Sequence, residues 1–281
     1  MKRAKKPAIA VIGSGRAATA VLAHAARRRI RSVPLAEAEF VVLAVSDRAI
    51  GVVARRLARE VPTGWAGKTA IHLSGALGPE PLEPLRRRGA RVGALHPLTV
   101  FAHEPSPRGP RWHRLDGDAP FRRAARALAK ALFPDSEELR PRRPLGPEGR
   151  ARYHAAAALV ANDLAALIRD GVTLFRSVGL PRARAEQALG DLASDATHAI
   201  VEGGLRRGLT GPVVRGDVGT VERHLEALRE VDPEIAEVHR VLSLRLVPIA
   251  VEARRITASQ AAALRSVLRP PGGGPRRGRG V

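Results

Sequence analysis

Short apolar runs alternate with amphipathic segments through the first half of the chain. The runs are rich in β-branched and small apolar residues and predict strands at 7–13, 38–47, 67–77 and 91–101. The segments between them predict helices at 15–27, 48–60 and 79–90, and a further strand at 111–118 and a helix at 119–132 follow. This alternation predicts an α/β fold with a parallel, doubly wound sheet.

The pattern changes near Arg150. Residues 151–180 form one long apolar helical pattern, and further helices are predicted near 181–207, 217–230 and 232–264, with no convincing strand among them. We therefore predict a Rossmann-like domain at 1–149 and an all-α domain at 150–268. The tail, 269–281, has the composition of disordered chain and little apolar surface to bury.

Composition excludes some classes of site. The 281 residues include no cysteine, so disulfides and thiolate metal sites are excluded, and the histidine spacings indicate no metal site. No apolar run is long enough for a membrane span, and the N-terminus leads into a predicted strand without a cleavage signal. A cytoplasmic protein is expected.

The formal net charge of +21 is spread along the chain and carried mostly by arginine. Aromatic residues make up only 3% of the sequence, so stacking platforms for single strands are nearly absent. We expect non-specific binding of nucleic acid at low salt and no dedicated nucleic-acid function.

A glycine pair follows the first predicted strand, in VIGSGRAATA at 11–20. Gly13 permits a sharp turn, Gly15 lets backbone N–H groups approach a pyrophosphate, and Ala18 permits close helix packing. This glycine turn predicts dinucleotide binding, the alternative being an ordinary turn that binds nothing. The expected cofactor-binding residues are those of the turn and those at the ends of the next two strands: Gly13, Ser14, Gly15, Arg16, Ala17, Val45, Ser46, Asp47, Ser74 and Gly75.

The second strand of such a domain is missing here or reduced to RIRSV at 29–33. A dinucleotide-binding fold usually ends that strand near an acidic residue that binds the ribose, about 20 positions after the glycines. No Asp or Glu occurs between Gly13 and Glu37. The basic residues Arg27 to Arg29 are instead candidates to hold a 2′-phosphate, which favours NADP over NAD.

Several specific segments occur in a recognisable order: SGAL at 74–77, HPL at 96–98, YHAAAALVAN at 153–162, and LTGPVVRGD at 209–217. Together they resemble a family of Rossmann-like bacterial proteins with a helical C-terminal domain of unknown function. That family is related to pyrroline-5-carboxylate reductase, the β-hydroxyacid dehydrogenases and prephenate dehydrogenase. The resemblance implies an NAD(P)-type fold, a helical domain that often dimerises, and hydride transfer to or from a small keto or imino acid.

His96 is the most suggestive single residue. It ends a predicted strand before the rigid Pro97 and is placed to donate to a substrate carbonyl or carboxylate. The alternative is a histidine satisfied by the backbone of its turn. Ser46 and Asp47 also end a strand and are candidates to contact the nicotinamide ribose, unless Asp47 serves as the N-cap of the next helix.

The first helix of the second domain offers further candidates. β-Hydroxyacid dehydrogenases carry a catalytic lysine four residues before an asparagine, and Ala158 occupies that lysine position here. His154 precedes Ala158 by one turn and Asn162 follows it by one turn, so they share a face. His154 is a candidate proton donor, since imidazole titrates near neutrality, or an interface residue. The neighbouring Tyr153 is a candidate substrate contact.

The LTGPVVRGD segment provides Thr210 and Arg215 as candidate substrate-binding residues. A guanidinium fork matches a carboxylate bidentately, so Arg215 suits a carboxylate substrate. Asp217 is expected to cap the following helix. The competing interpretation is a non-catalytic ligand-binding or regulatory protein on a degenerate Rossmann fold, motivated by the reduced second strand and the absent lysine.

Overall fold

The computed structural model describes residues 6–104 and 107–270 and divides into two compact units, Met1–Asn162 and Asp163–Val281. The helix after the proline-rich segment, α5 (Pro147–Ala161), counts with the first unit. Two of its side chains, Arg150 and Tyr153, contact residues of the sheet. The predicted tail lies outside the described residues except for Arg269 and Pro270.

The first unit is built on a seven-stranded sheet in the order β2-β1-β3-β4-β5-β6-β7. Its strands are β1 (Ala8–Ile12), β2 (Arg31–Ser32), β3 (Phe40–Leu43), β4 (Thr69–His72), β5 (Arg91–Pro97), β6 (Trp112–Gly117) and β7 (Glu137–Glu138). Neighbours from β2 to β5 are parallel, as predicted, whereas β6 is antiparallel to β5. The chain passes from β5 to β6 without a crossover helix. Two consecutive strands of a sheet can lie parallel only when a crossover connects them.

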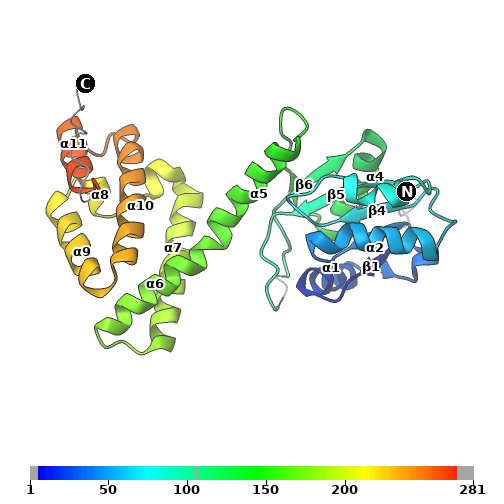
Figure 1. Ribbon diagram of the computed structural model, residues 1–281, viewed down its shortest axis with the longest axis horizontal. Coiled ribbons are helices and arrows are strands. Elements are labelled where there is room, and N and C mark those ends of the chain that lie inside the picture. The colour runs from blue at the N-terminus through cyan, green and yellow to red at the C-terminus, as the bar shows by residue number, and fades with distance from the viewer. Residues whose placement is uncertain (1–5, 105–106, 271–281) are drawn as a thin grey trace, which may run out of the picture. The chain divides into compact units, whose positions relative to one another are not determined.

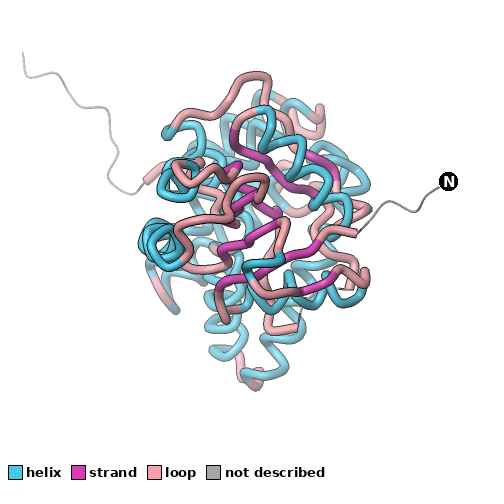
Figure 2. Tube along the Cα trace, turned by 90° about the vertical axis from the view of Figure 1, so that its right-hand side faces the viewer, coloured by secondary structure: helices cyan, strands magenta, loops and turns pink. Residues whose placement is uncertain are grey.

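Helices cover both faces of this sheet (Figures 1 and 2), which confirms the doubly wound prediction. One core packs α1 (Arg16–Arg27) and α4 (Ala119–Leu132) against strand residues that include Ile9 and Leu95. The other packs α2 (Asp47–Glu60), η2 (Glu80–Leu82) and α3 (Glu83–Arg86) against residues that include Val41 and Val92. Parallel strands buried on both faces read as continuous apolar runs, which is why the sequence located them well.

The second strand survives in reduced form. Only Arg31 and Ser32 pair with β1, and one 3₁₀ turn, η1 (Leu35–Glu37), replaces the helix that would lead to β3. Of the two predicted outcomes, deletion or shrinkage, the structure shows shrinkage.

The structure contradicts the role expected of Arg27 to Arg29. The glycine turn precedes α1, whereas Arg27 ends this helix and Arg28 and Arg29 follow it, and the 12-residue helix separates its two ends by about 18 Å. The Arg28 carbonyl accepts from Lys6 Nζ at 2.6 Å, just before β1 begins. The three arginines therefore lie at the amino edge of the sheet, opposite the edge where a dinucleotide would bind.

The second unit is helical throughout its described residues. It contains α6 (Asp163–Ser177), α7 (Arg182–Gly208), α8 (Pro212–Arg215), α9 (Val218–Val231), α10 (Pro233–Glu252) and α11 (Ala258–Val267). The prediction of one helix over 232–264 was wrong, because Arg254 takes a positive φ of 54° and Thr257 starts a new helix with a capping box. Buried residues of α8 to α11, including Val221 and Leu264, form its core. Within the described part of the chain, no helix is long and apolar enough to cross a membrane.

Candidate functional site

The glycine turn leaves the N-terminus of α1 open to an anion. Gly13 has a φ of 134°, and a Cβ there would lie 2.2 Å from the Ala44 carbonyl oxygen, so only glycine fits beside the end of β3. Gly15 is the N-cap of α1 and provides no side-chain cap, while a Cβ built on it would meet nothing within 4 Å. Ser14 and Arg16 are exposed and Ala17 is half-buried. Uncapped N–H groups facing open space fit a pyrophosphate.

A hydrogen-bonded loop follows β4 at the same edge of the sheet. The Ser74 hydroxyl donates to Asp47 Oδ2 at 2.9 Å and accepts from the backbone N–H groups of Ala76 and Leu77, both at 3.1 Å. We call residues Ser74 to Gly78 the 74–78 loop. Asp47 therefore ties this loop to the start of α2. The alternative in which Asp47 caps α2 is wrong, since Ser46 occupies the cap position.

Two imidazoles meet at Gly75. A Cβ on this residue would lie 2.8 Å from both His96 Nε2 and His154 Nδ1. His96 comes from β5 and His154 from α5, and their ring centroids are 6.1 Å apart. The glycine of the SGAL segment thus permits a close approach of two predicted catalytic residues to the backbone after β4.

His96 and Tyr153 form a neutral pair. The Tyr153 hydroxyl is hydrogen-bonded to His96 Nδ1 at 2.9 Å, and the two rings meet edge to face. Burial, assisted by His154 and Arg114, lowers the pKa of His96 to about 4, and burial raises the pKa of Tyr153. At pH 7 the pair can donate and accept hydrogen bonds, but His96 does not carry a charge.

His72 lies beneath the 74–78 loop with both ring nitrogens satisfied. Its Nδ1 accepts from the Ser74 N–H at 3.2 Å, so Nε2 carries the proton and donates to the Gly78 carbonyl at 2.7 Å. Burial lowers its pKa. The imidazole supports the loop from below rather than facing a ligand.

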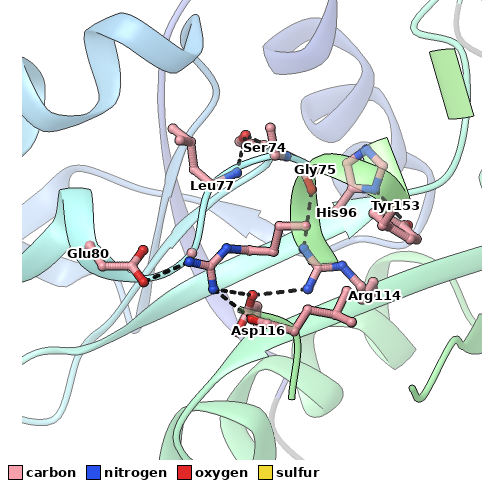
Figure 3. A network of polar contacts seen from close by, with 12 residues as sticks. Ser74, Gly75, Leu77, Glu80, His96, Arg114, Asp116 and Tyr153 are labelled. Carbon is pink, nitrogen blue, oxygen red and sulfur yellow. Dashed lines mark hydrogen bonds and ion pairs between the residues drawn. The ribbon is translucent and has the colours of Figure 1, made fainter. Parts of the chain in front are cut away.

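A buried ionic network, missed by sequence reasoning, surrounds this site (Figure 3). Arg114 contacts Asp116, the Gly75 carbonyl and the face of the Tyr153 ring. Asp116 and Glu80 also accept from Arg150, on α5. In a chain with 48 lysines and arginines, nothing in the sequence marks two of them as buried. Only the pairing of β6 with β5, which sets Arg114 opposite His96, identifies it.

Other predicted residues lie elsewhere. Asn162 ends α5 as its exposed C-cap, two turns beyond His154 or about 12 Å along the helix. Thr210 and Arg215 belong to the second unit, where both are exposed. Val45 is half-buried at the end of β3. The substrate and cofactor roles of these residues stay predictions.

Asp217 caps α9 as predicted, accepting from the Thr220 N–H at 3.0 Å. No group of three or more His, Cys, Asp or Glu side chains in the described ranges is placed to hold a metal ion.

Two protein families match the chain. A Rossmann-like domain matches residues 2–97, and the domain of unknown function DUF2520 matches residues 115–246. The chain thus combines a Rossmann-like domain with a C-terminal DUF2520 domain. The resemblance inferred from the SGAL, HPL, YHAAAALVAN and LTGPVVRGD segments is thereby confirmed. No curated protein matches this Rossmann-like DUF2520 protein in sequence.

Solved structures share its fold at low sequence identity. Protein TM1727 from Thermotoga maritima is 21% identical, with 88% of this chain and 99% of that chain covered and a TM-score of 0.64. An imine reductase variant from Myxococcus stipitatus in complex with NAD+ is 18% identical, with 94% and 100% covered and a TM-score of 0.54. A reductive aminase from Aspergillus terreus in complex with NADPH4, cyclohexanone and allyl amine is 16% identical, with 94% and 100% covered and a TM-score of 0.52. At these identities the likeness establishes the fold.

Proposed function

We propose that this Rossmann-like DUF2520 protein is an NAD(P)-dependent oxidoreductase that transfers a hydride to or from a small keto or imino acid. The observation that carries the proposal is the convergence of His96 and His154 on Gly75, with Tyr153 hydrogen-bonded to His96, at the edge of the sheet that also holds the open glycine turn. Ligands of open α/β sheets bind at this carboxyl edge. The imine reductase and reductive aminase folds, which hold nicotinamide cofactors in their own crystals, support it.

The residues present fit the pyrophosphate half of such a cofactor better than its adenosine half. Gly13 and Gly15 would hold the pyrophosphate on the first N–H groups of α1. Val45, Ser46, Asp47, Ser74 and Gly75 would border the nicotinamide half, because they follow β3 and β4 at the same edge. When bound, the nicotinamide ring supplies or accepts the hydride.

The 2′-phosphate of NADP needs a basic partner other than Arg27 to Arg29. Arg16 starts α1 and Arg48 lies in the first turn of α2, and both are exposed at the carboxyl edge of the sheet. A guanidinium there would pair with a phosphate, so we propose NADP as the preferred cofactor.

Protons are handled by the histidines in this proposal. The exposed His154 would deliver a proton to the substrate oxygen or nitrogen as the hydride arrives at carbon. The neutral His96, held by Tyr153, would orient the substrate by hydrogen bonding. Thr210, Arg215 and Asn162 stay candidates for substrate binding.

The second candidate function is non-catalytic ligand binding on the same fold, and the two-residue β2 favours it. The adenosine pocket of a dinucleotide site is normally walled by that strand. A protein without the wall would bind a smaller phosphate ligand more readily than a dinucleotide.

Titration of the purified protein with NADPH and NADH at moderate salt separates the two candidates. We expect micromolar NADPH binding by fluorescence and thermal shift, followed by NADPH oxidation with a member of a panel of keto acids offered with and without amines. Absence of binding by either cofactor at millimolar concentration would exclude the oxidoreductase and favour the second candidate.

A further inference from the structure

Two side chains of α5 lie against the 74–78 loop, one at each of its glycines. Arg150 and His154 are four residues apart and therefore share a face of the helix. A Cβ on Gly75 would lie 2.8 Å from His154 Nδ1, and a Cβ on Gly78 would lie 2.6 Å from Arg150 Cζ. Both glycines of the loop thus make room for α5.

Asp116 connects this helix to the strand opposite His96. Its Oδ2 accepts from Arg114 Nη1 at 3.0 Å and from Arg150 Nη1 at 3.4 Å. Arg114 continues the connection, since its Nη2 donates to the Gly75 carbonyl at 3.3 Å and its guanidinium lies 4.8 Å from the centre of the Tyr153 ring. We call Arg114, Asp116 and Arg150 the Asp116 bridge.

The Asp116 bridge is a poor device for stability alone. The side chains of Arg114 and Arg150 are 3% and 8% exposed, whereas their carboxylate partners Asp116 and Glu80 are 15% and 65% exposed. Within the described part of the chain, Nε of each arginine has no hydrogen-bond partner. Buried ion pairs of this kind are often matched or exceeded in stability by apolar side chains of similar size. A planar guanidinium instead fixes the directions of several contacts at once.

We propose that Asp116 and Arg150 are positioning residues, which hold α5 against the 74–78 loop so that Tyr153 and His154 stay on His96 and Gly75. Their importance for catalysis rests on the proposed function, whereas the positioning itself does not. Arg150 precedes Tyr153 by three residues, so its anchorage sets the height and rotation of the helix turn that presents the tyrosine. Arg114 contacts the face of the Tyr153 ring from the side of the sheet.

The charge state of His96 reports this arrangement. The groups that face it are Tyr153 and His154 from α5, Arg114 from β6, Asp47 from α2 and His72 from β4. Burial is the largest cause of its lowered pKa. Release of α5 would admit water, and the pKa would rise towards the ordinary value of about 6.5.

The test is an NMR titration of the imidazoles in the full chain between pH 5 and 8, with His96 assigned by loss of its signal in His96→Gln. We expect His96 to stay neutral in the unmodified protein and to titrate above about pH 5.5 in Arg150→Met. Arg150→Lys keeps a cation for Asp116 and should restore the neutral state. The matched control is Arg152→Met on the same helix, where Arg152 and its partner Glu148 are 80% and 88% exposed, and it should change nothing.

A folded Arg150→Met in which His96 remains neutral down to pH 5 would overturn the proposal. If that variant does not fold, Gly78→Ala replaces it. The added methyl displaces the Arg150 guanidinium, while the charges of Arg150 and Asp116 both remain. Gly78→Ala should raise the His96 pKa in the same way, and a neutral His96 there would also overturn the proposal. The titration needs no cofactor, so failure of nicotinamide binding would refute the proposed function and leave this result standing.

Discussion

At the scale of single residues, the site depends on an imidazole kept uncharged by its surroundings. His96 is half-buried between α5 and β6. The Tyr153 hydroxyl that is hydrogen-bonded to its Nδ1 is neutral. Desolvation disfavours the charged imidazolium by more than the attraction of nearby Asp47 favours it. Folding therefore competes with protonation at this residue.

This competition predicts a specific acid sensitivity. The pKa of His96 is about 4 in the folded chain and near 6.5 when unfolded, so the unfolded state binds the proton first as pH falls. Stability is lost between pH 6.5 and 4 and levels off below. Across this window, the free energy of unfolding of the unmodified protein should fall by up to about 3 kcal/mol more than that of His96→Gln.

Urea unfolding of both proteins at pH 7, 5.5 and 4 measures the difference. The lowered pKa values of His24, His72, His113 and His239 act in both proteins and cancel. Equal losses in the two proteins would show that His96 is solvated in the fold.

At the scale of elements, α1 separates two arginine groups that the sequence places close together. Arg16 begins the helix beside the glycine turn, and Arg28 follows its last turn at the opposite edge of the sheet. Only the first of these ends presents unpaired N–H groups, and the helix dipole there also favours an anion. Cofactor selectivity should depend on the start of α1 and not on its end.

Arg16→Gln should therefore weaken NADPH binding about tenfold while changing NADH binding little, since a charge-assisted hydrogen bond to phosphate contributes about 1.5–3 kcal/mol. Arg28→Gln is the matched control and should leave both affinities unchanged. Fluorescence titration at constant salt measures them. Equal weakening of NADPH and NADH by Arg16→Gln would assign the arginine to the pyrophosphate instead of the 2′-phosphate.

At the scale of the whole molecule, α7 leaves several large apolar side chains exposed. Only Ala185 of its 27 residues is buried, whereas Leu192, Val201 and Leu205 are 61%, 72% and 58% exposed. Most helices draw their stability from an apolar face that packs on a neighbour. We propose that a second copy of the chain packs against these exposed apolar side chains.

Light scattering after size exclusion should accordingly give the mass of a dimer. Leu192→Glu with Val201→Glu should shift the protein to monomer by placing charges in the contact. Val52→Glu is the control, since Val52 is 58% exposed on α2 of the first unit and should leave the mass unchanged. A monomeric unmodified protein would contradict the prediction.

The sequence by itself determined the order of elements and part of the site. Apolar runs buried on both faces of a sheet, the glycine turn and the cap at Asp217 are local patterns with local physical causes. His96, Tyr153 and His154 were recognisable as candidates because they stand at a strand end and on one helix. The absence of a full second strand was also readable, because too few residues remain between α1 and β3.

Only the tertiary structure decided which side chains meet. The antiparallel register of β6 places Arg114 opposite His96, and the docking of α5 brings Arg150 to Asp116 and His154 to Gly75. These contacts join residues 18 to 79 positions apart along the chain, so no local periodicity encodes them. The direction of α1 likewise removed Arg27 to Arg29 from the cofactor edge. Burial of a charged group depends on the partners that long-range packing supplies, and sequence composition alone does not reveal those partners.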